Sequence, residues 1–346
     1  MRSFRDLAPR PARWPAALAL ALVLPLAGCS ADSDRPEAAP PASGASPGGG
    51  AGTAPPEVRG RLAVDGHDRR YLLHRPAADG RRPLVIAFHG RGERAADLRE
   101  KSALQRAAGR RGMLVAFPEG LDRGWGAGSR ATASRPDPGL DVRFTEALVR
   151  HLVRTERADS RRVYVAGFSN GGSMALRMAA ERPALIAGAA SVSGQLTAGD
   201  AAVKPTGPVP VMVVYGADDP VRPLAGLPSP PPDPEEPILP SLSARDTAEA
   251  FADAGGAGAP VTRARKGYDE TVWRAGDGGD GDAVRLLVVH DAGHTWPGTA
   301  VAPPDGFGPV SKDLDATAAI LDFFTGPASR PAAPADRPRR PTGRAG

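Results

Sequence analysis

The sequence predicts an α/β fold in which a mostly parallel, doubly wound sheet is covered by helices on both faces. Short apolar runs recur along the chain without the polar alternation that marks a half-exposed strand, and segments with helical spacing separate them. The part of the chain with this pattern, residues 57–326, is about 270 residues long, which suits a single domain of this class.

The first elements are expected to form an antiparallel edge of the sheet. Residues 61–64 and 69–75 have strand composition and flank Asp65-Gly66, a dipeptide that favours the tight turn of a β-hairpin. An apolar run at 84–90 that ends in His-Gly is expected to form a buried strand, followed by a helix at 95–108 and a buried strand at 113–117.

The second half of the domain repeats the alternation of helix and buried strand. It predicts a helix at 141–157, a strand at 163–166, a helix at 172–182, strands at 187–192 and 209–215, a helix at 244–254, a strand at 286–290 and a helix at 314–324. The proline-rich segment 224–240 reads as a loop inserted after a strand end, either disordered or bordering a substrate cleft.

Residues 1–28 have the features of a lipoprotein signal peptide. Several arginines precede the apolar stretch 16–26, which is too short for a permanent membrane span, and Leu-Ala-Gly-Cys closes the segment. Cys29 is the single cysteine of the chain, so it is the expected site of lipid attachment and no internal disulfide can form. Lipidation would anchor the protein to a membrane from outside the cytoplasm. The alternative is that Cys29 is an incidental small residue, lost with the signal.

Residues 29–56 and 327–346 are expected to be a disordered linker and a disordered tail. Both are rich in proline and lack apolar periodicity, so they cannot bury a core. The net charge of +5 derives in part from arginines in the signal and the tail. The sequence has no stripe of basic and aromatic residues, no zinc-type cluster and no phosphate-binding loop, so we expect no nucleic-acid partner, metal or cofactor.

The G-x-S-x-G sequence around Ser169 is the strongest functional signal. An apolar, β-branched run breaks into Gly167-Phe168-Ser169-Asn170-Gly171, and a helix-forming segment follows at once. In a nucleophile elbow, this strand, turn and helix raise a serine hydroxyl above the carboxyl ends of a parallel sheet. The sequence therefore predicts Ser169 as a catalytic nucleophile, with a plain Gly/Ser turn as the alternative.

A serine nucleophile needs a base, and the base needs an acid that orients it. Asp218-Asp219 and His294 each follow a predicted strand, in the chain order Ser, Asp, His that such an enzyme requires. The alternatives are a pair of turn-forming aspartates and a structural loop histidine. His290 is a rival base, but it ends an apolar strand and is expected to point into the surroundings of the sheet.

A tetrahedral intermediate also needs N–H donors for its oxyanion. The backbone of Asn170, directly after the nucleophile, is expected to supply one donor. The loop after His89-Gly90 is expected to supply the second, from the backbone of Arg91. His89 itself is expected to support this loop rather than to transfer protons.

A set of motifs across nearly the whole domain resembles the polyhydroxybutyrate depolymerase and feruloyl esterase family of secreted α/β-hydrolases. Gly293-His294-Thr295-Trp296-Pro297-Gly298 is the most specific of them, and G-x-S-x-G alone is the least. The others are Phe88-His89-Gly90, Phe117-Pro118-Glu119-Gly120 with Trp125, Asp141-Val142-Arg143-Phe144, residues 163–172 and Gly216-Ala217-Asp218-Asp219-Pro220-Val221.

The resemblance implies an α/β-hydrolase fold and a triad of Ser169, Asp219 and His294 that cleaves carboxylic esters through an acyl-enzyme. Asp219 is preferred over Asp218 because the family's catalytic aspartate directly precedes Pro-Val. Acyl transfer through serine requires no cofactor or metal.

Three further residues, Trp125, Trp296 and His89, are candidates for substrate binding, with core or loop packing as the alternative for the tryptophans. Arg91 occupies a position where many relatives carry a cysteine. This departure from the family pattern makes the sequence less informative about the substrate than about the reaction. The resemblance implies a serine esterase acting on polyhydroxyalkanoate-type polyesters or on feruloyl or acetyl esters of polysaccharides, and the lipoprotein signal predicts that it is extracytoplasmic and lipid-anchored. An amide-cleaving hydrolase and a non-catalytic envelope-binding lipoprotein are the alternatives.

Overall fold

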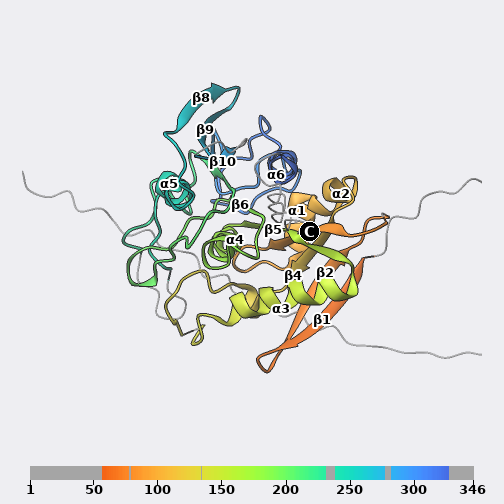
Figure 1. The fold of residues 1–346 in the computed structure, drawn as a ribbon. Helices are drawn as coiled ribbons and strands as arrows, with labels where there is room; N and C mark the ends of the chain where they lie inside the picture. Colours follow the sequence, from red (N-terminus) through yellow and green to blue (C-terminus); the bar gives the residue numbers. More distant parts are fainter. Residues whose placement is uncertain (1–56, 78, 134, 231–237, 277–281, 327–346) are drawn as a thin grey trace, which may run out of the picture. The chain divides into compact units, whose positions relative to one another are not determined.

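The structure is a computed structural model that describes residues 57–77, 79–133, 135–230, 238–276 and 282–326 (Figure 1). The predicted signal peptide, linker and tail, at 1–28, 29–56 and 327–346, lie outside these residues, as does Cys29. None of the helices in the described ranges combines the length and the apolar character that a membrane span requires.

The described residues alternate between strands and helices in chain order. The strands are β1 (Val58–Val64), β2 (His67–His74), β3 (Arg82–Phe88), β4 (Leu114–Pro118), β5 (Ala158–Phe168), β6 (Gly188–Val192), β7 (Val211–Gly216), β8 (Val261–Arg265), β9 (Tyr268–Arg274) and β10 (Asp282–Val289). The helices are α1 (Ala95–Ser102), α2 (Leu104–Gly109), α3 (Leu140–Thr155), α4 (Asn170–Glu181), α5 (Ala244–Ala254) and α6 (Ala316–Thr325).

These strands form one ten-stranded sheet in the order β1-β2-β4-β3-β5-β6-β7-β10-β9-β8. The central strands from β4 to β10 pair in parallel, as predicted. The predicted antiparallel hairpin at one edge is confirmed: β1 pairs with β2 across a turn in which Asp65 and Gly66 both have positive φ. The opposite edge is also antiparallel, because β9 and β8 continue the sheet beyond β10.

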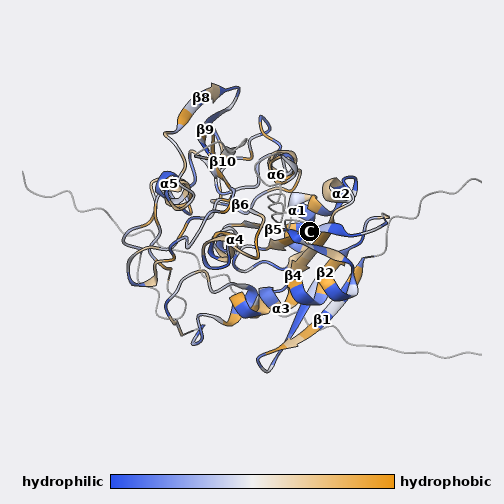
Figure 2. Ribbon diagram, viewed as in Figure 1, coloured by the Kyte–Doolittle hydropathy of each residue, from blue (hydrophilic) through white to orange (hydrophobic). Residues whose placement is uncertain are grey.

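Helices cover both faces of the sheet, and each buried strand sends alternate side chains to the two faces (Figure 1). In β3, Ile86 and Phe88 pack with α3 and α4, whereas Val85 and Ala87 pack on the side of α1, α2 and α6. Helix α3 shows hydrophobic and hydrophilic residues along its length (Figure 2), and its buried positions recur at helical spacing.

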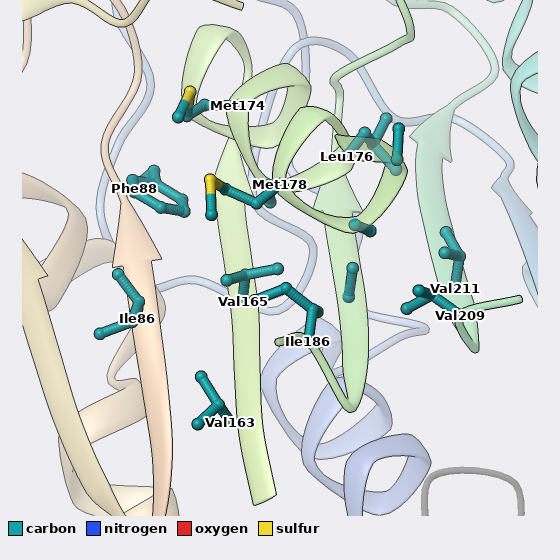
Figure 3. Close-up of a cluster of buried hydrophobic side chains, with 14 of the residues drawn as sticks. Ile86, Phe88, Val163, Val165, Met174, Leu176, Met178, Ile186, Val209 and Val211 are labelled. Atoms are coloured by element: carbon teal, nitrogen blue, oxygen red, sulfur yellow. The ribbon is translucent and has the colours of Figure 1, made fainter. Parts of the chain in front are cut away.

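The apolar cluster beneath α4 fixes this helix against the centre of the sheet (Figure 3). Each large aliphatic side chain that is fully buried contributes about 1.5–3 kcal/mol. Because α4 begins directly after Ser169, this packing also fixes the site of the predicted nucleophile. The labelled side chains are Ile86, Phe88, Val163, Val165, Met174, Leu176, Met178, Ile186, Val209 and Val211.

The structure differs from the predicted elements at two places. The single helix expected at 95–108 is two helices, because Ala103 adopts a left-handed conformation with φ of 51° and breaks the hydrogen-bond ladder. Strands β8 and β9 were not predicted. All residues of β8 are exposed, so this strand lacks the apolar signal of a buried one.

Candidate active site

Ser169 lies in the sharp turn between β5 and α4, with φ of 53° and ψ of −120°. An L-residue rarely adopts a positive φ, so the packing around the turn must hold it there. A Cβ at Gly167 would lie 2.1 Å from the carbonyl oxygen of Gly171, and a Cβ at Gly171 would lie 2.1 Å from that of Phe88. Both glycines are therefore required by close approaches of backbone, as in a nucleophile elbow.

A continuous chain of hydrogen bonds joins Ser169, His294 and Asp219. The Nε2 atom of His294 lies 2.8 Å from Oγ of Ser169, and its Nδ1 atom lies 2.7 Å from Oδ2 of Asp219. The other carboxylate oxygen of Asp219 accepts hydrogen bonds from the backbone N–H groups of Val221 (2.9 Å) and Arg222 (2.8 Å). These two donors fix the carboxylate in the orientation that meets the imidazole.

His294 is held between aromatic rings and is 2% exposed. The ring centroids of Phe168 and Phe307 lie 5.1 and 5.3 Å from that of His294. Its backbone N–H donates to the carbonyl oxygen of Phe307, and a Cβ at Gly293 would lie 2.1 Å from that same oxygen. The imidazole therefore has a fixed position in surroundings of low polarity, where its hydrogen bonds are strong.

The two rival residues, Asp218 and His290, lie apart from this arrangement. Asp218 is exposed, while the neighbouring Asp219 is buried. The expectation that His290 points into the surroundings of the sheet is wrong, because β10 ends at Val289 and the side chain of His290 is 45% exposed. Its Nε2 atom lies 3.2 Å from Oδ2 of Asp269.

A cavity of about 460 Å³ opens beside Ser169. Asn170 and Arg91, the predicted donors to an oxyanion, both lie in its wall, together with His294 and Trp125. Asn170 is the first residue of α4, and the first N–H groups of a helix have no partner within the helix. The backbone N–H of this position is therefore suited to donate a hydrogen bond to the oxyanion of a tetrahedral intermediate.

The side chain of Asn170 ties the elbow to the loop that carries Trp125. Its Oδ1 atom accepts the backbone N–H of Trp125 at 2.7 Å, and its Nδ2 group donates to the carbonyl oxygen of Trp125 at 3.1 Å. The indole N–H of Trp125 donates to the carbonyl oxygen of His89 at 2.9 Å. Trp125 thus lines the cavity and also joins the elbow to the loop after β3.

Three buried arginines and Asp141 support the same loop on the side away from the cavity. Asp141 accepts hydrogen bonds from the backbone N–H of Gly126 (2.8 Å) and from Arg69 (2.9 Å), and Arg135 lies 3.3 Å away. Arg177 donates to the carbonyl oxygen of Gly126 at 2.7 Å. Burial lowers the pKa of Arg69, while the carboxylate of Asp141 opposes this shift. The cavity wall at Trp125 therefore rests on a network of buried charges.

His89 does not reach the cavity, so its candidacy as a substrate-binding residue is wrong. The side chain is fully buried, Nδ1 donates to the carbonyl oxygen of Gly90 at 2.7 Å, and Nε2 accepts the backbone N–H of Gly120 at 3.0 Å. Burial lowers the pKa of His89, since the charged form loses its hydration. His89 joins the loop after β3 to the loop after β4, which agrees with the expected supporting role.

Trp296 also lies outside the cavity wall, which corrects its expected place in the cleft. It is 1% exposed, it packs in the apolar cluster beneath α6, and its indole N–H donates to Oγ1 of Thr317 at 3.0 Å. The most specific motif of the sequence therefore combines a residue of the site, His294, with a tryptophan of the core. The alternative reading of Trp296 as a packing residue is the one that the structure supports.

The cavity has further wall residues that sequence reasoning missed, among them Arg222, Phe307 and Leu239. Arg222 follows Asp219 by three positions, so the acid loop was a signal for it. Phe307 stands in a segment with no motif, and only the fold brings it to His294. Ile238 and Leu239 show that the described end of the proline-rich segment borders the cleft.

Among the described residues, no group of three or more His, Cys, Asp or Glu side chains is placed to hold a metal ion.

Comparison with known proteins gives the same family as the motifs. The profile of the family described as Esterase PHB depolymerase matches residues 69–225. The putative esterase NocK of Nocardia uniformis subsp. tsuyamanensis is 40% identical over 280 residues, which cover 77% of this chain and 81% of that protein. Feruloyl esterase C of Emericella nidulans is 28% identical over 188 residues, which cover 51% of this chain and 64% of that protein.

Among solved structures, the acetyl xylan esterase from Aspergillus awamori is similar, with a TM-score of 0.53 at 17% sequence identity, over 77% of this chain and 98% of that one. At this identity, the likeness shows the α/β-hydrolase fold alone. The match to the relative from Nocardia covers most of both proteins at an identity that shows common descent. The chain therefore belongs to the PHB depolymerase family of esterases and is a carboxylic ester hydrolase.

Proposed function

We propose that this ester hydrolase uses Ser169 as its nucleophile, His294 as its base and Asp219 as the acid that orients the base. The observation that carries the proposal is the unbroken chain of hydrogen bonds from the carboxylate through the imidazole to the hydroxyl. A hydroxyl is a poor nucleophile at neutral pH, so its contact with a buried imidazole supplies the missing base.

In the proposed reaction, Oγ of Ser169 attacks the carbonyl carbon of the ester while Nε2 of His294 takes the hydroxyl proton. The backbone N–H groups of Asn170 and Arg91 stabilise the oxyanion of the tetrahedral intermediate. When this intermediate collapses, His294 returns the proton to the leaving alcohol, and the acyl group stays on Ser169. A water molecule then attacks the acyl-enzyme while His294 takes its proton, and His294 returns this proton to Oγ of Ser169 as the acid is released.

The proposed role of Asp219 is to hold the tautomer and the orientation of His294. Its Oδ2 atom accepts the Nδ1 proton, which leaves Nε2 as the acceptor for the proton of Ser169. The carboxylate also stabilises the imidazolium that forms during the reaction.

We further propose that the substrates are polyhydroxyalkanoate-type polyesters or feruloyl or acetyl esters of polysaccharides. The family description, Esterase PHB depolymerase, supports the polyesters, and the relatives named feruloyl esterase support the feruloyl esters. We also propose an extracytoplasmic location with a lipid anchor at Cys29, which the signal-peptide features of residues 1–28 support.

Labelling with a fluorophosphonate tests the nucleophile directly. The parent protein is expected to label and to hydrolyse short p-nitrophenyl esters, whereas Ser169→Ala is expected to lose the label and to lower kcat/KM by at least about three orders of magnitude. Ser160→Ala is the matched control, because Ser160 is an exposed serine of the same strand β5. Labelling of Ser169→Ala at the parent level would refute the proposed nucleophile.

A further inference from the structure

The charged residues in the wall of the cavity are mostly cationic. Glu93 is the acidic member, and its carboxylate bonds to Nζ of Lys101, which neutralises it. The basic members are Arg91, Arg130, Arg135 and Arg222. A neutral ester gains little from cationic side chains in the wall, whereas an anionic group would be attracted by them.

Two of these arginines already have carboxylate partners in the protein. Nε of Arg135 lies 3.3 Å from Asp141, in the buried network that supports the wall. A guanidinium nitrogen of Arg130 lies 2.9 Å from Asp200 on the surface. Their charges are therefore compensated, and they leave less attraction for a bound anion.

Arg222 differs from them because it has no carboxylate within salt-bridge distance among the residues that the structure describes. Its Nε group is buried and has no hydrogen-bond partner there, although the residue as a whole is partly exposed and lines the cavity. The exposed part of Arg222 therefore offers the cavity a cation whose charge no carboxylate of the described residues neutralises.

The backbone of Arg222 is fixed next to the proposed triad. Its N–H donates to Oδ1 of Asp219 at 2.8 Å, and its carbonyl oxygen accepts the hydroxyl of Tyr215 at 3.0 Å. The neighbouring Val221 is 42% exposed and also lines the cavity, as does Ile238, which is 39% exposed. The region around Arg222 thus offers a guanidinium on a fixed backbone beside exposed aliphatic side chains.

We propose that Arg222 is a specificity-determining residue that binds an anionic group, a carboxylate by preference, on the acyl or the alcohol part of the ester. This inference rests on the proposed serine esterase and names a substrate class for it: esters that carry a negative charge on an aliphatic or aromatic body. A guanidinium suits this role because its planar array of N–H donors matches the two oxygens of a carboxylate.

Two matched pairs of esters that differ in charge test the proposal and locate the anion. p-Nitrophenyl hydrogen adipate and p-nitrophenyl methyl adipate carry the difference on the acyl part. 4-Acetoxybenzoate and methyl 4-acetoxybenzoate carry it on the alcohol part. For each pair, the ratio of kcat/KM for the anionic over the neutral ester is compared between the parent and Arg222→Gln, so intrinsic reactivity cancels.

In at least one pair, Arg222→Gln is expected to lower this ratio at least about tenfold, the usual effect of losing a charge-assisted hydrogen bond. Arg222→Lys, which keeps the charge, should recover part of the ratio. Arg263→Gln controls for the net charge, because Arg263 is exposed on the edge strand β8. Ratios within about twofold of the parent in both pairs would overturn the proposal.

A binding measurement keeps this test separate from that of the proposed function. Titration calorimetry of the Ser169→Ala protein with methyl hydrogen adipate and with dimethyl adipate compares the two ligands without turnover. Preferential binding of the half-ester, lost when Arg222→Gln is added, supports the anion site even if Ser169 is not the nucleophile. Equal binding of both ligands would contradict the anion site and leave the role of Ser169 unaffected.

Discussion

Asp218 and Asp219 have identical side chains, but the fold gives them opposite surroundings. Asp219 is buried and each of its carboxylate oxygens has a partner, whereas Asp218 is exposed. Buried carboxylates that orient a base depend on accepting hydrogen bonds from every side, so an amide in the same place would present a donor where acceptors are needed.

We therefore expect Asp219→Asn to lower kcat on a p-nitrophenyl ester by about two to four orders of magnitude. Asp218→Asn is the matched control and should stay within about twofold of the parent. Steady-state kinetics at pH 7 to 8 check both, with far-UV circular dichroism to confirm folding. If kcat fell by similar factors in the two variants, Asp219 would not be the single residue that orients His294.

At the scale of single elements, the turn between β5 and α4 requires glycine where a side chain would meet neighbouring backbone. A Cβ at Gly171 would lie 2.1 Å from the carbonyl oxygen of Phe88 and 2.4 Å from that of His89. These contacts are with the backbone of β3 and of the loop after it, in the centre of the sheet, so neither partner can move away cheaply.

Gly171→Ala is therefore expected to lower the free energy of unfolding by more than about 3 kcal/mol. Gly258→Ala provides the comparison, because a Cβ at Gly258 meets no atom within 4 Å and its φ is not positive. Urea denaturation of both variants measures the difference. If Gly171→Ala were as stable as the parent, the close approach at the elbow would be disproved.

The loops after β3 and β4 depend on a neutral His89. Burial lowers the pKa of His89 below 6.5, so the unfolded chain binds a proton more readily than the folded one. The folded state is therefore stabilised above about pH 6.5 and loses this contribution as the pH falls. The loss is up to about 1.4 kcal/mol for each pH unit until the lowered pKa is reached.

We expect His89→Gln to show a flatter decline in the free energy of unfolding between pH 7 and pH 5 than the parent. His74, whose pKa is also lowered by burial, remains in both proteins and contributes with the same sign. Urea titrations at a series of pH values give the two slopes, and His67→Gln, at an exposed position, controls for the loss of one histidine. Parallel slopes for His89→Gln and the parent would contradict the buried neutral state.

At the scale of the whole molecule, the sheet order brings three distant loops to one place. β5 leads to Ser169, β7 leads to Asp219 and β10 leads to His294, and all three run in parallel, so their carboxyl ends share one edge of the sheet. This edge is where ligands bind in open parallel sheets. The order of strands across the sheet, rather than the spacing of residues along the chain, thus determines which residues form the site.

The proposed location of the protein is also a property of the whole chain. If lipid is attached at Cys29, Cys29→Ala should move the protein from the detergent-extracted membrane fraction to the soluble fraction, with its esterase activity per molecule unchanged. One lipid-modified cysteine is expected to carry more than one acyl chain, since a single chain binds a membrane only weakly. An unchanged distribution between the fractions would rule out this anchor.

The sequence by itself determined the features that depend on local backbone requirements. The hairpin at Asp65-Gly66, the elbow around Ser169 and the alternation of buried strands with helices could be predicted because each depends on residues adjacent in the chain. The order Ser, Asp, His and the preference for Asp219 followed from motifs, and the structure brings these residues into contact.

Only the tertiary structure decided which surface each side chain meets. Trp296 and His294 are two positions apart, yet one packs beneath α6 and the other faces Ser169. The second antiparallel edge, the contact of Phe307 with His294 and the unpartnered Nε group of Arg222 likewise depend on segments far away in the chain. Whether a residue is buried, and which residue it contacts, depends on the segment that the fold places opposite it. No local sequence pattern encodes that segment.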